Sequence, residues 1–128
     1  MKRSLLNECL RIAIRINPKH PEYNYYHHFS FVIQNNQIME WGTNRGEGAT
    51  PLIGYPEYSK LHSEARAYFK ARGLLERGKN FEVINIRLNK RGDVRISRPC
   101  KCCSSFLKFL GCRTVWFTTL NGFAKLSL

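Results

Sequence analysis

The sequence predicts an α/β protein in which helices cover both faces of a mixed sheet as a three-layer α/β/α sandwich. Segments with helical and strand-like patterns follow one another in the order helix, strand, strand, helix, strand, helix, strand. Such alternation is typical of helices packed against a sheet that contains parallel strands. The 128 residues contain no repeat and no linker, so we expect residues 1–128 to form one domain with its own core.

Residues 4–16 carry apolar side chains at helical spacing, with arginines on the other faces. This pattern predicts an amphipathic helix that ends at Asn17-Pro18. The segment lacks the uninterrupted apolar region of a secretory signal, and no run approaches the length of a membrane span. We therefore expect a cytoplasmic protein with reduced thiols and no membrane partner.

Residues 29–33 and 38–42 are short strand-like runs on either side of a polar turn, which predicts a hairpin. The stretch from residue 45 to residue 60 contains Gly and Pro and is expected to be a long loop. It leads into a predicted helix over residues 61–75. Residues 81–88 are rich in β-branched and apolar side chains and predict the third strand.

Residues 100–110 are expected to form a helix closed by Gly111, and residues 114–119 a fourth strand. Only a short turn with Asn121-Gly122 separates this strand from the last segment. A parallel return needs a crossover of a dozen or more residues, whereas Asn-Gly is a preferred hairpin turn. The fifth and last strand should therefore run antiparallel to the fourth.

Two short motifs carry the chemistry, His62-Ser63-Glu64 and Pro99-Cys100-Lys101-Cys102-Cys103. Catalytic zinc takes three nitrogen or sulfur ligands and keeps one position open for water. His62, Cys100 and Cys103 supply such a set, because residues three apart at a helix start present both sulfurs on one side. Pro99 suits the start of such a helix. Glu64 can reach the water without binding the metal, so it is the expected proton shuttle.

Each motif has an alternative interpretation. A C-x-x-C pair can be a redox pair or half of a structural zinc site. A redox pair has no use for His62 and Glu64, and a structural site lacks an obvious fourth ligand, so the combination favours catalytic zinc. Cys102 should point away from the shared face and, like Cys9 and Cys112, be an ordinary buried or half-buried residue.

Together, these motifs and the order of elements resemble the zinc-dependent cytidine/deoxycytidylate deaminase superfamily. Its motifs H-x-E and P-C-x-x-C match His62, Glu64, Pro99, Cys100 and Cys103. The resemblance covers nearly the whole chain. It implies a mixed five-stranded sheet of cytidine-deaminase type, Zn²⁺ as cofactor and hydrolytic conversion of cytosine to uracil.

The hairpin and the residues after it resemble the tRNA adenosine and deoxycytidylate deaminase branches, which implies that Asn44 contacts the sugar of the substrate. The alternative is that Asn44 only satisfies the turn that follows it. Three features depart from the family. Phe29-Ser30 stands where relatives carry a small pair, and Arg98 stands where they carry Glu or Ser. The antiparallel last strand resembles free cytidine deaminases and bacterial DNA-deaminating toxins, which weakens an adenine substrate.

The net charge of +12 and the pI near 9.9 favour a polyanionic partner. Basic residues lead into the cysteine helix with only Asp93 opposing them, namely Arg87, Lys90, Arg91, Arg95, Arg98 and Lys101. We expect these six residues, among them Arg95, Arg98 and Lys101, to contact phosphates, with a solvated basic face as the alternative.

Aromatic side chains lie next to the expected substrate path. Tyr55 and Tyr58 fall in the loop before His62, and His28 follows a tyrosine-rich segment that precedes the first strand. Because any base can stack on such rings, we expect all three to contact substrate, with core or rim packing as the alternative. We do not expect His28 to be a further zinc ligand.

The sequence thus predicts a zinc-dependent cytosine deaminase that acts on single-stranded nucleic acid, DNA rather than RNA. A free (deoxy)cytidine or deoxycytidylate deaminase is the alternative, because it explains the small size and the hairpin ending. An adenine deaminase is less favoured. A non-catalytic zinc module that binds nucleic acid is also less favoured, since it gives Glu64 no role. The oligomeric state stays open.

Overall fold

The structure is a computed structural model that describes residues 1–17, 27–43 and 63–128. The described elements are α1 (Arg3–Ile16), β1 (His27–Gln34), β2 (Gln37–Thr43), α2 (Ser63–Ala71), β3 (Phe81–Leu88), β4 (Val94–Arg95), α3 (Lys101–Phe109), β5 (Cys112–Thr119) and β6 (Gly122–Ser127). Apart from β4, they follow the predicted order.

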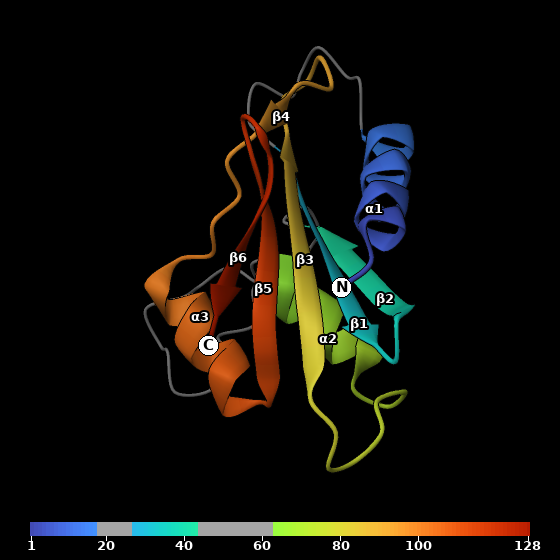
Figure 1. Ribbon diagram of the computed structural model, residues 1–128, viewed down its shortest axis with the longest axis vertical. Coiled ribbons are helices and arrows are strands. Elements are labelled where there is room, and N and C mark those ends of the chain that lie inside the picture. Colours follow the sequence, from blue (N-terminus) through green and yellow to red (C-terminus); the bar gives the residue numbers. More distant parts are fainter. Residues whose placement is uncertain (18–26, 44–62) are drawn as a thin grey trace.

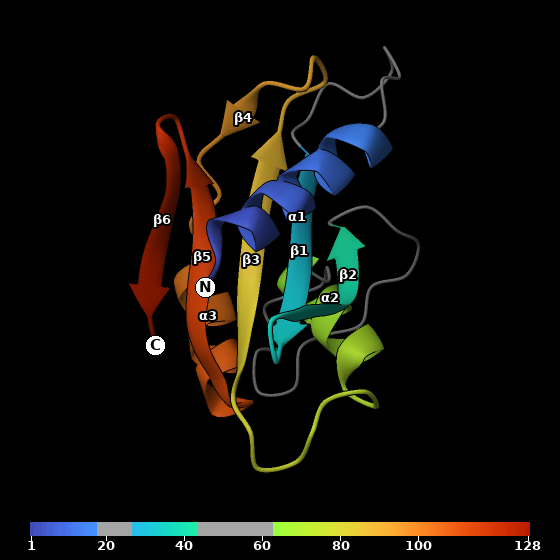
Figure 2. The same ribbon diagram turned by 45° about the vertical axis from the view of Figure 1, so that its right-hand side comes forward.

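One sheet runs in the order β2-β1-β3-β5-β6, and the short β4 pairs with the end of β3. The strands β3 and β5 are parallel, and the other pairs are antiparallel. Helix α1 covers one face, while α2 and α3 cover the other (Figures 1 and 2). The predicted α/β/α sandwich with a mixed sheet is confirmed, as is the antiparallel last strand.

The face under α1 is closed by large apolar side chains. Leu6, Cys9 and Ala13 lie on one side of α1 and pack against strand residues such as Phe31 and Ile84. These positions repeat at helical spacing, which is why the amphipathic pattern predicted this helix correctly. Burial, and then the nearby Glu8 carboxylate, raise the pKa of the Cys9 thiol to about 12.

The opposite face is closed by α2 and α3. Val83 and Val115 from the strands pack against Ala67 of α2 and Leu107 of α3. Helix α2 lies very close to β2, because a Cβ atom added at Gly42 would stand 2.6 Å from the backbone nitrogen of Ala67. This close approach sets the position of the first turn of α2.

Two predicted boundaries were wrong, and one strand was missed. His27 and His28 belong to β1 instead of preceding it, and the buried His27 contacts Asn17 through Nδ1 and Oδ1 at 2.7 Å. Helix α2 ends at Ala71, where a turn begins around Gly73, a poor helix former. The extra strand β4 was missed, so within the described residues the sheet has six strands instead of five. Two residues are too few for a strand pattern in sequence.

Among the described residues, none of the helices combines the length and the apolar character that a membrane crossing requires.

Candidate active site

Glu64 lies in the first turn of α2 and is almost completely buried, with 6% of its surface exposed. A buried carboxylate needs hydrogen-bond partners to offset its lost hydration. One partner is Asn85 of β3, whose Nδ2 donates to Glu64 Oε1 at 2.8 Å. The carboxylate is therefore positioned both by the first turn of α2 and by a hydrogen bond from β3 of the sheet.

The cysteine motif lies at the start of α3. The helix begins at Lys101, so Cys100 is its N-cap and Pro99 precedes the cap. The predicted helix start at Cys100 was one residue early, because Cys100 has an extended backbone with φ −69° and ψ 166°. Cys100 Sγ accepts a hydrogen bond from the backbone nitrogen of Cys103 at 3.5 Å, which caps the helix.

The two motifs meet in space. Burial raises the pKa of the Cys103 thiol, and the Glu64 carboxylate and the Cys100 sulfur raise it further, in part through hydrogen bonds with both side chains. Cys103 thus lies next to the Glu64 carboxylate and next to the Cys100 sulfur, near the N-terminal ends of α2 and α3.

The donor set suits zinc, because two thiols at a helix N-terminus are readily converted to thiolate ligands. A bound divalent cation would also reverse the rise in the Cys103 pKa, since a coordinating thiol is deprotonated. Within residues 1–17, 27–43 and 63–128, no three His, Cys, Asp or Glu side chains form a group that could hold a metal ion. The third predicted ligand, His62, lies outside the described residues, directly before α2. Zinc binding therefore stays a prediction.

A row of residues runs across the sheet beneath α2 and α3. Ser30 pairs with Gly42 on one side and with Asn85 on the other, and Asn85 pairs with Phe117. Ser30 Oγ donates to Asn85 Oδ1 at 2.7 Å and contacts Ser63 Oγ at 2.7 Å. Ser30 belongs to the pair Phe29-Ser30, which departs from the resembled family, and it is thus hydrogen-bonded into the site.

Ser97 fixes the segment that leads to Cys100. Its backbone nitrogen donates to the Thr118 carbonyl at 3.0 Å, and its hydroxyl donates to the Asn85 carbonyl at 2.8 Å. The Thr118 nitrogen donates to Ser97 Oγ at 2.8 Å. The segment is therefore tied to both β3 and β5 just before the cysteine motif.

Ser63, Asn85 and Ser97 had no predicted role in the site. One signal was present, because Asn85 interrupts the apolar run Val83–Ile86 of a strand that is buried on both faces. A polar side chain in such a strand must find partners inside the protein. Which partners it finds depends on the helices above it.

The predicted phosphate contacts are spread around this site. The Arg98 guanidinium lies over the Phe117 ring, 5.7 Å from its centre, next to the row that contains Asn85. Lys101 is exposed at the first position of α3. Both side chains therefore belong to the surroundings of the site.

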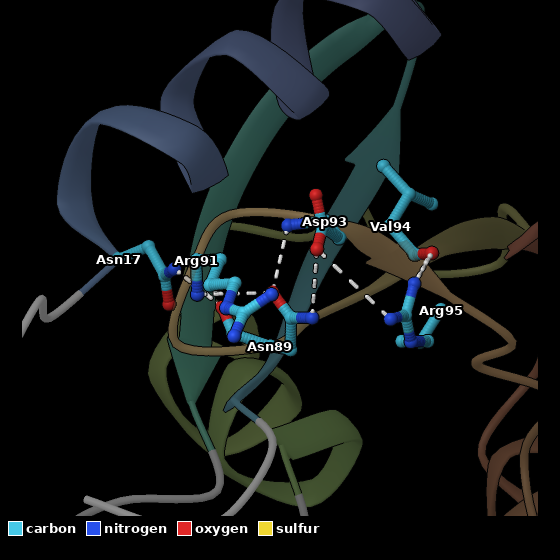
Figure 3. A network of polar contacts seen from close by, with 6 residues as sticks. All are labelled: Asn17, Asn89, Arg91, Asp93, Val94 and Arg95. Atoms are coloured by element: carbon cyan, nitrogen blue, oxygen red, sulfur yellow. Dashed lines mark hydrogen bonds and ion pairs between the residues drawn. The ribbon is translucent and has the colours of Figure 1, made fainter.

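Arg95 lies on β4 beside an acidic side chain (Figure 3). Its Nη2 is 4.0 Å from Asp93 Oδ2, and its Nη1 donates to the Val94 carbonyl at 3.1 Å. Asn89 in turn holds Asp93, because its Oδ1 accepts from the Asp93 nitrogen at 2.8 Å (Figure 3). The only acid of the basic stretch thus faces Arg95.

His28 is half-buried and pairs across strands with Arg87, which pairs with Arg95. Cross-strand partners point to the same face of a sheet, so these three form a basic row beside the row of Asn85. Asn44, Tyr55 and Tyr58 lie outside the described residues. The substrate role of all these side chains stays a prediction.

A comparison with solved structures finds a similar fold in the crystal structure of cytidine deaminase from Mycobacterium leprae, with a TM-score of 0.55. The two chains are 14% identical, and the match covers 93% of this chain and 91% of that chain. No family model matches the chain, and no curated protein matches it. The comparison confirms the predicted fold, a mixed sheet of cytidine-deaminase type.

Proposed function

We propose that the protein is a zinc-dependent hydrolytic deaminase that converts cytosine to uracil in single-stranded nucleic acid, DNA rather than RNA. The observation that carries this proposal is the buried Glu64 carboxylate beside Cys103 at the meeting of two helix starts. The likeness of the fold to a cytidine deaminase supports it.

His62, Cys100 and Cys103 would hold the zinc ion. When bound, zinc supplies a Lewis acid that activates water for attack at neutral pH. Glu64 would take a proton from the attacking water as a bond forms to C4 of cytosine and deliver it to N3. It would then take the proton of the new hydroxyl on C4 and deliver it to the amino group, which leaves as ammonia when the C4–N bond breaks and the C4 carbonyl forms. The buried position of Glu64 fits this role, because protons pass between fixed partners away from bulk water.

The basic surroundings support a polymeric substrate. Arg98 and Lys101 flank the cysteine motif, and the row of His28, Arg87 and Arg95 lies next to the row of Asn85. A positive surface on this scale exceeds what one free nucleoside needs, and it suits a phosphate backbone. Tyr55 and Tyr58 would add stacking surfaces for bases.

A free (deoxy)cytidine or deoxycytidylate deaminase is the second candidate. The antiparallel pair of β5 and β6 favours it, together with the fold similarity to a protein named as cytidine deaminase. The two candidates share the metal ligands and Glu64 and differ only in the size of the substrate.

The test is mass spectrometry of four substrates after incubation with zinc-loaded protein: a single-stranded oligodeoxynucleotide, an oligoribonucleotide, cytidine and deoxycytidylate. We expect a mass gain of about 1 Da for each cytosine converted in the oligodeoxynucleotide, because an amino group is replaced by an oxygen. Efficient conversion of the small substrates alone would establish the second candidate. Binding of oligonucleotide with no conversion of any substrate would identify a non-catalytic module.

The variant Glu64→Gln should keep its fold and about one zinc per chain and lose turnover by a factor on the order of 10²–10⁴. Glu82→Gln is the matched control, because Glu82 is a half-buried carboxylate on the same strand as Asn85 that accepts from Trp116 Nε1 at 2.9 Å. It should retain activity. A zinc-loaded Glu64→Gln protein with normal turnover would refute the proposed reaction.

A further inference from the structure

A chain of buried hydrogen bonds leads from the start of α2 through the sheet and back to Glu64. Its members are Ser63, Ser30, Asn85 and Glu64, and each is less than a tenth exposed. Each contact between successive members is 2.7 or 2.8 Å long. The chain joins two neighbouring residues of α2 to two neighbouring strands.

The direction of each hydrogen bond follows from the donors available. Ser30 has one hydroxyl proton and donates it to Asn85 Oδ1, so the Ser63 hydroxyl must be the donor to Ser30. With Oδ1 engaged in this way, the amide turns Nδ2 toward Glu64 Oε1. The second proton of Nδ2 points to the Ser97 carbonyl at 3.4 Å. The amide therefore has one orientation that satisfies all of its neighbours.

We propose that Asn85 is a positioning residue that holds the Glu64 carboxylate in the geometry for proton transfer, and that Ser30 and Ser63 fix the orientation of its amide. This inference rests on the proposed deaminase function. Asn85 does not need to touch substrate or metal for this role. It acts by leaving Glu64 one hydrogen-bonded position at the cluster with Cys103. Such preorganisation raises the rate because the group is already aligned when the reaction begins.

The test is Asn85→Asp, which keeps the shape of the side chain and replaces the donating nitrogen by an oxygen. Two carboxylates then face each other, so Glu64 should leave its position. For zinc-loaded molecules we expect kcat to fall by a factor on the order of ten to one hundred, as misplacement of a catalytic group does. KM should stay within about threefold, because substrate binding is unchanged.

Asn17→Asp is the matched control. Asn17 is also a buried asparagine with both ends bonded, to His27 and to the Asn89 carbonyl at 3.0 Å, but it lies at the end of α1. It should lower stability and leave kcat of the zinc-loaded protein unchanged. A purely structural role for Asn85 predicts this same outcome for Asn85→Asp, and that result would overturn the proposal.

A second readout does not need activity. The double variant Asn85→Asp/Glu64→Gln again pairs a donor with an acceptor, so it should regain at least half of the thermal stability that Asn85→Asp loses. No recovery would show that the two side chains do not hold each other. If Asn85→Asp fails to fold, Ser30→Ala tests the proposal instead. We expect its kcat to fall severalfold at unchanged zinc content, and an unchanged kcat would overturn the proposal.

The proposed deaminase function and the positioning role of Asn85 can be refuted separately. A wild-type protein that deaminates no cytosine substrate would refute the proposed function, while the stability comparison of the double variant would still decide whether Asn85 holds Glu64. Normal wild-type activity with a fully active, zinc-loaded Asn85→Asp protein would refute only the positioning role.

Discussion

The position of α2 over the sheet depends on the missing side chain at Gly42, and Gly42→Ala tests this dependence. The added Cβ would lie 2.6 Å from the Ala67 nitrogen and 2.9 Å from Arg66 Cβ. Ordinary contacts of a Cβ atom begin at 3.4 Å, so α2 must move outward by about 0.8 Å. The obstacle is helix backbone, which cannot swing aside as the end of a flexible side chain can.

Overpacking of this kind costs about 1–3 kcal/mol, and replacing a strand glycine returns about 0.5–1 kcal/mol. We therefore expect a net loss of about 1–2 kcal/mol in the free energy of unfolding, measured by urea denaturation, and a fall in Tm on the order of 5 °C. Because the movement carries Glu64 away from Asn85, turnover should fall as well.

The control is Gly73→Ala. No atom lies within 4 Å of the added Cβ at Gly73, and its backbone is not in the left-handed region. The free energy of unfolding should change by no more than about 0.5 kcal/mol. A Gly42→Ala protein as stable as the wild type would refute the close packing of α2 on β2 and the geometry of the site that depends on it.

Three further predictions concern the cysteine motif, the basic residues around it and the core under α1. Cys103→Ser should lose zinc and thermal stability, because metal binding is coupled to folding, whereas Cys102→Ser should keep both; metal analysis that finds the reverse would show that the ligand register is wrong. Arg98→Ala should weaken oligonucleotide binding, and the affinity should then fall less steeply between about 50 and 200 mM salt, measured by fluorescence anisotropy. Arg113→Ala removes the same charge from an exposed position on β5 and should have a smaller effect on both. Burial raises the pKa of Cys9 from 9.0 to about 12, so the folded state keeps this thiol neutral after the unfolded chain has begun to ionise. The free energy of unfolding should therefore fall as pH rises from 9 toward 12, and in Cys9→Ala this fall should be smaller; an identical pH dependence would contradict the burial of this thiol.

The sequence by itself determined the elements other than β4 and two of the strand pairings, β1 with β2 and β5 with β6. The apolar period of α1 and the strand pattern of β3 depend on local alternation between buried and exposed positions, which the residue order records directly. The antiparallel direction of β6 followed from the length of the connection, since so short a turn leaves the chain no other way back. The motifs around Glu64 and Cys103 pointed to a candidate site because the proposed chemistry requires particular residue types at fixed spacings.

Only the tertiary structure decided how the site is held. The contact between Glu64 and Cys103 depends on the packing of α2 and α3 on one face, and the role of Asn85 depends on its neighbours across the sheet. A buried asparagine signals that it needs partners, but the sequence does not say which, because the partners come from distant segments. The same holds for Gly42, whose purpose is visible only when a helix from elsewhere in the chain lies 2.6 Å from its missing Cβ.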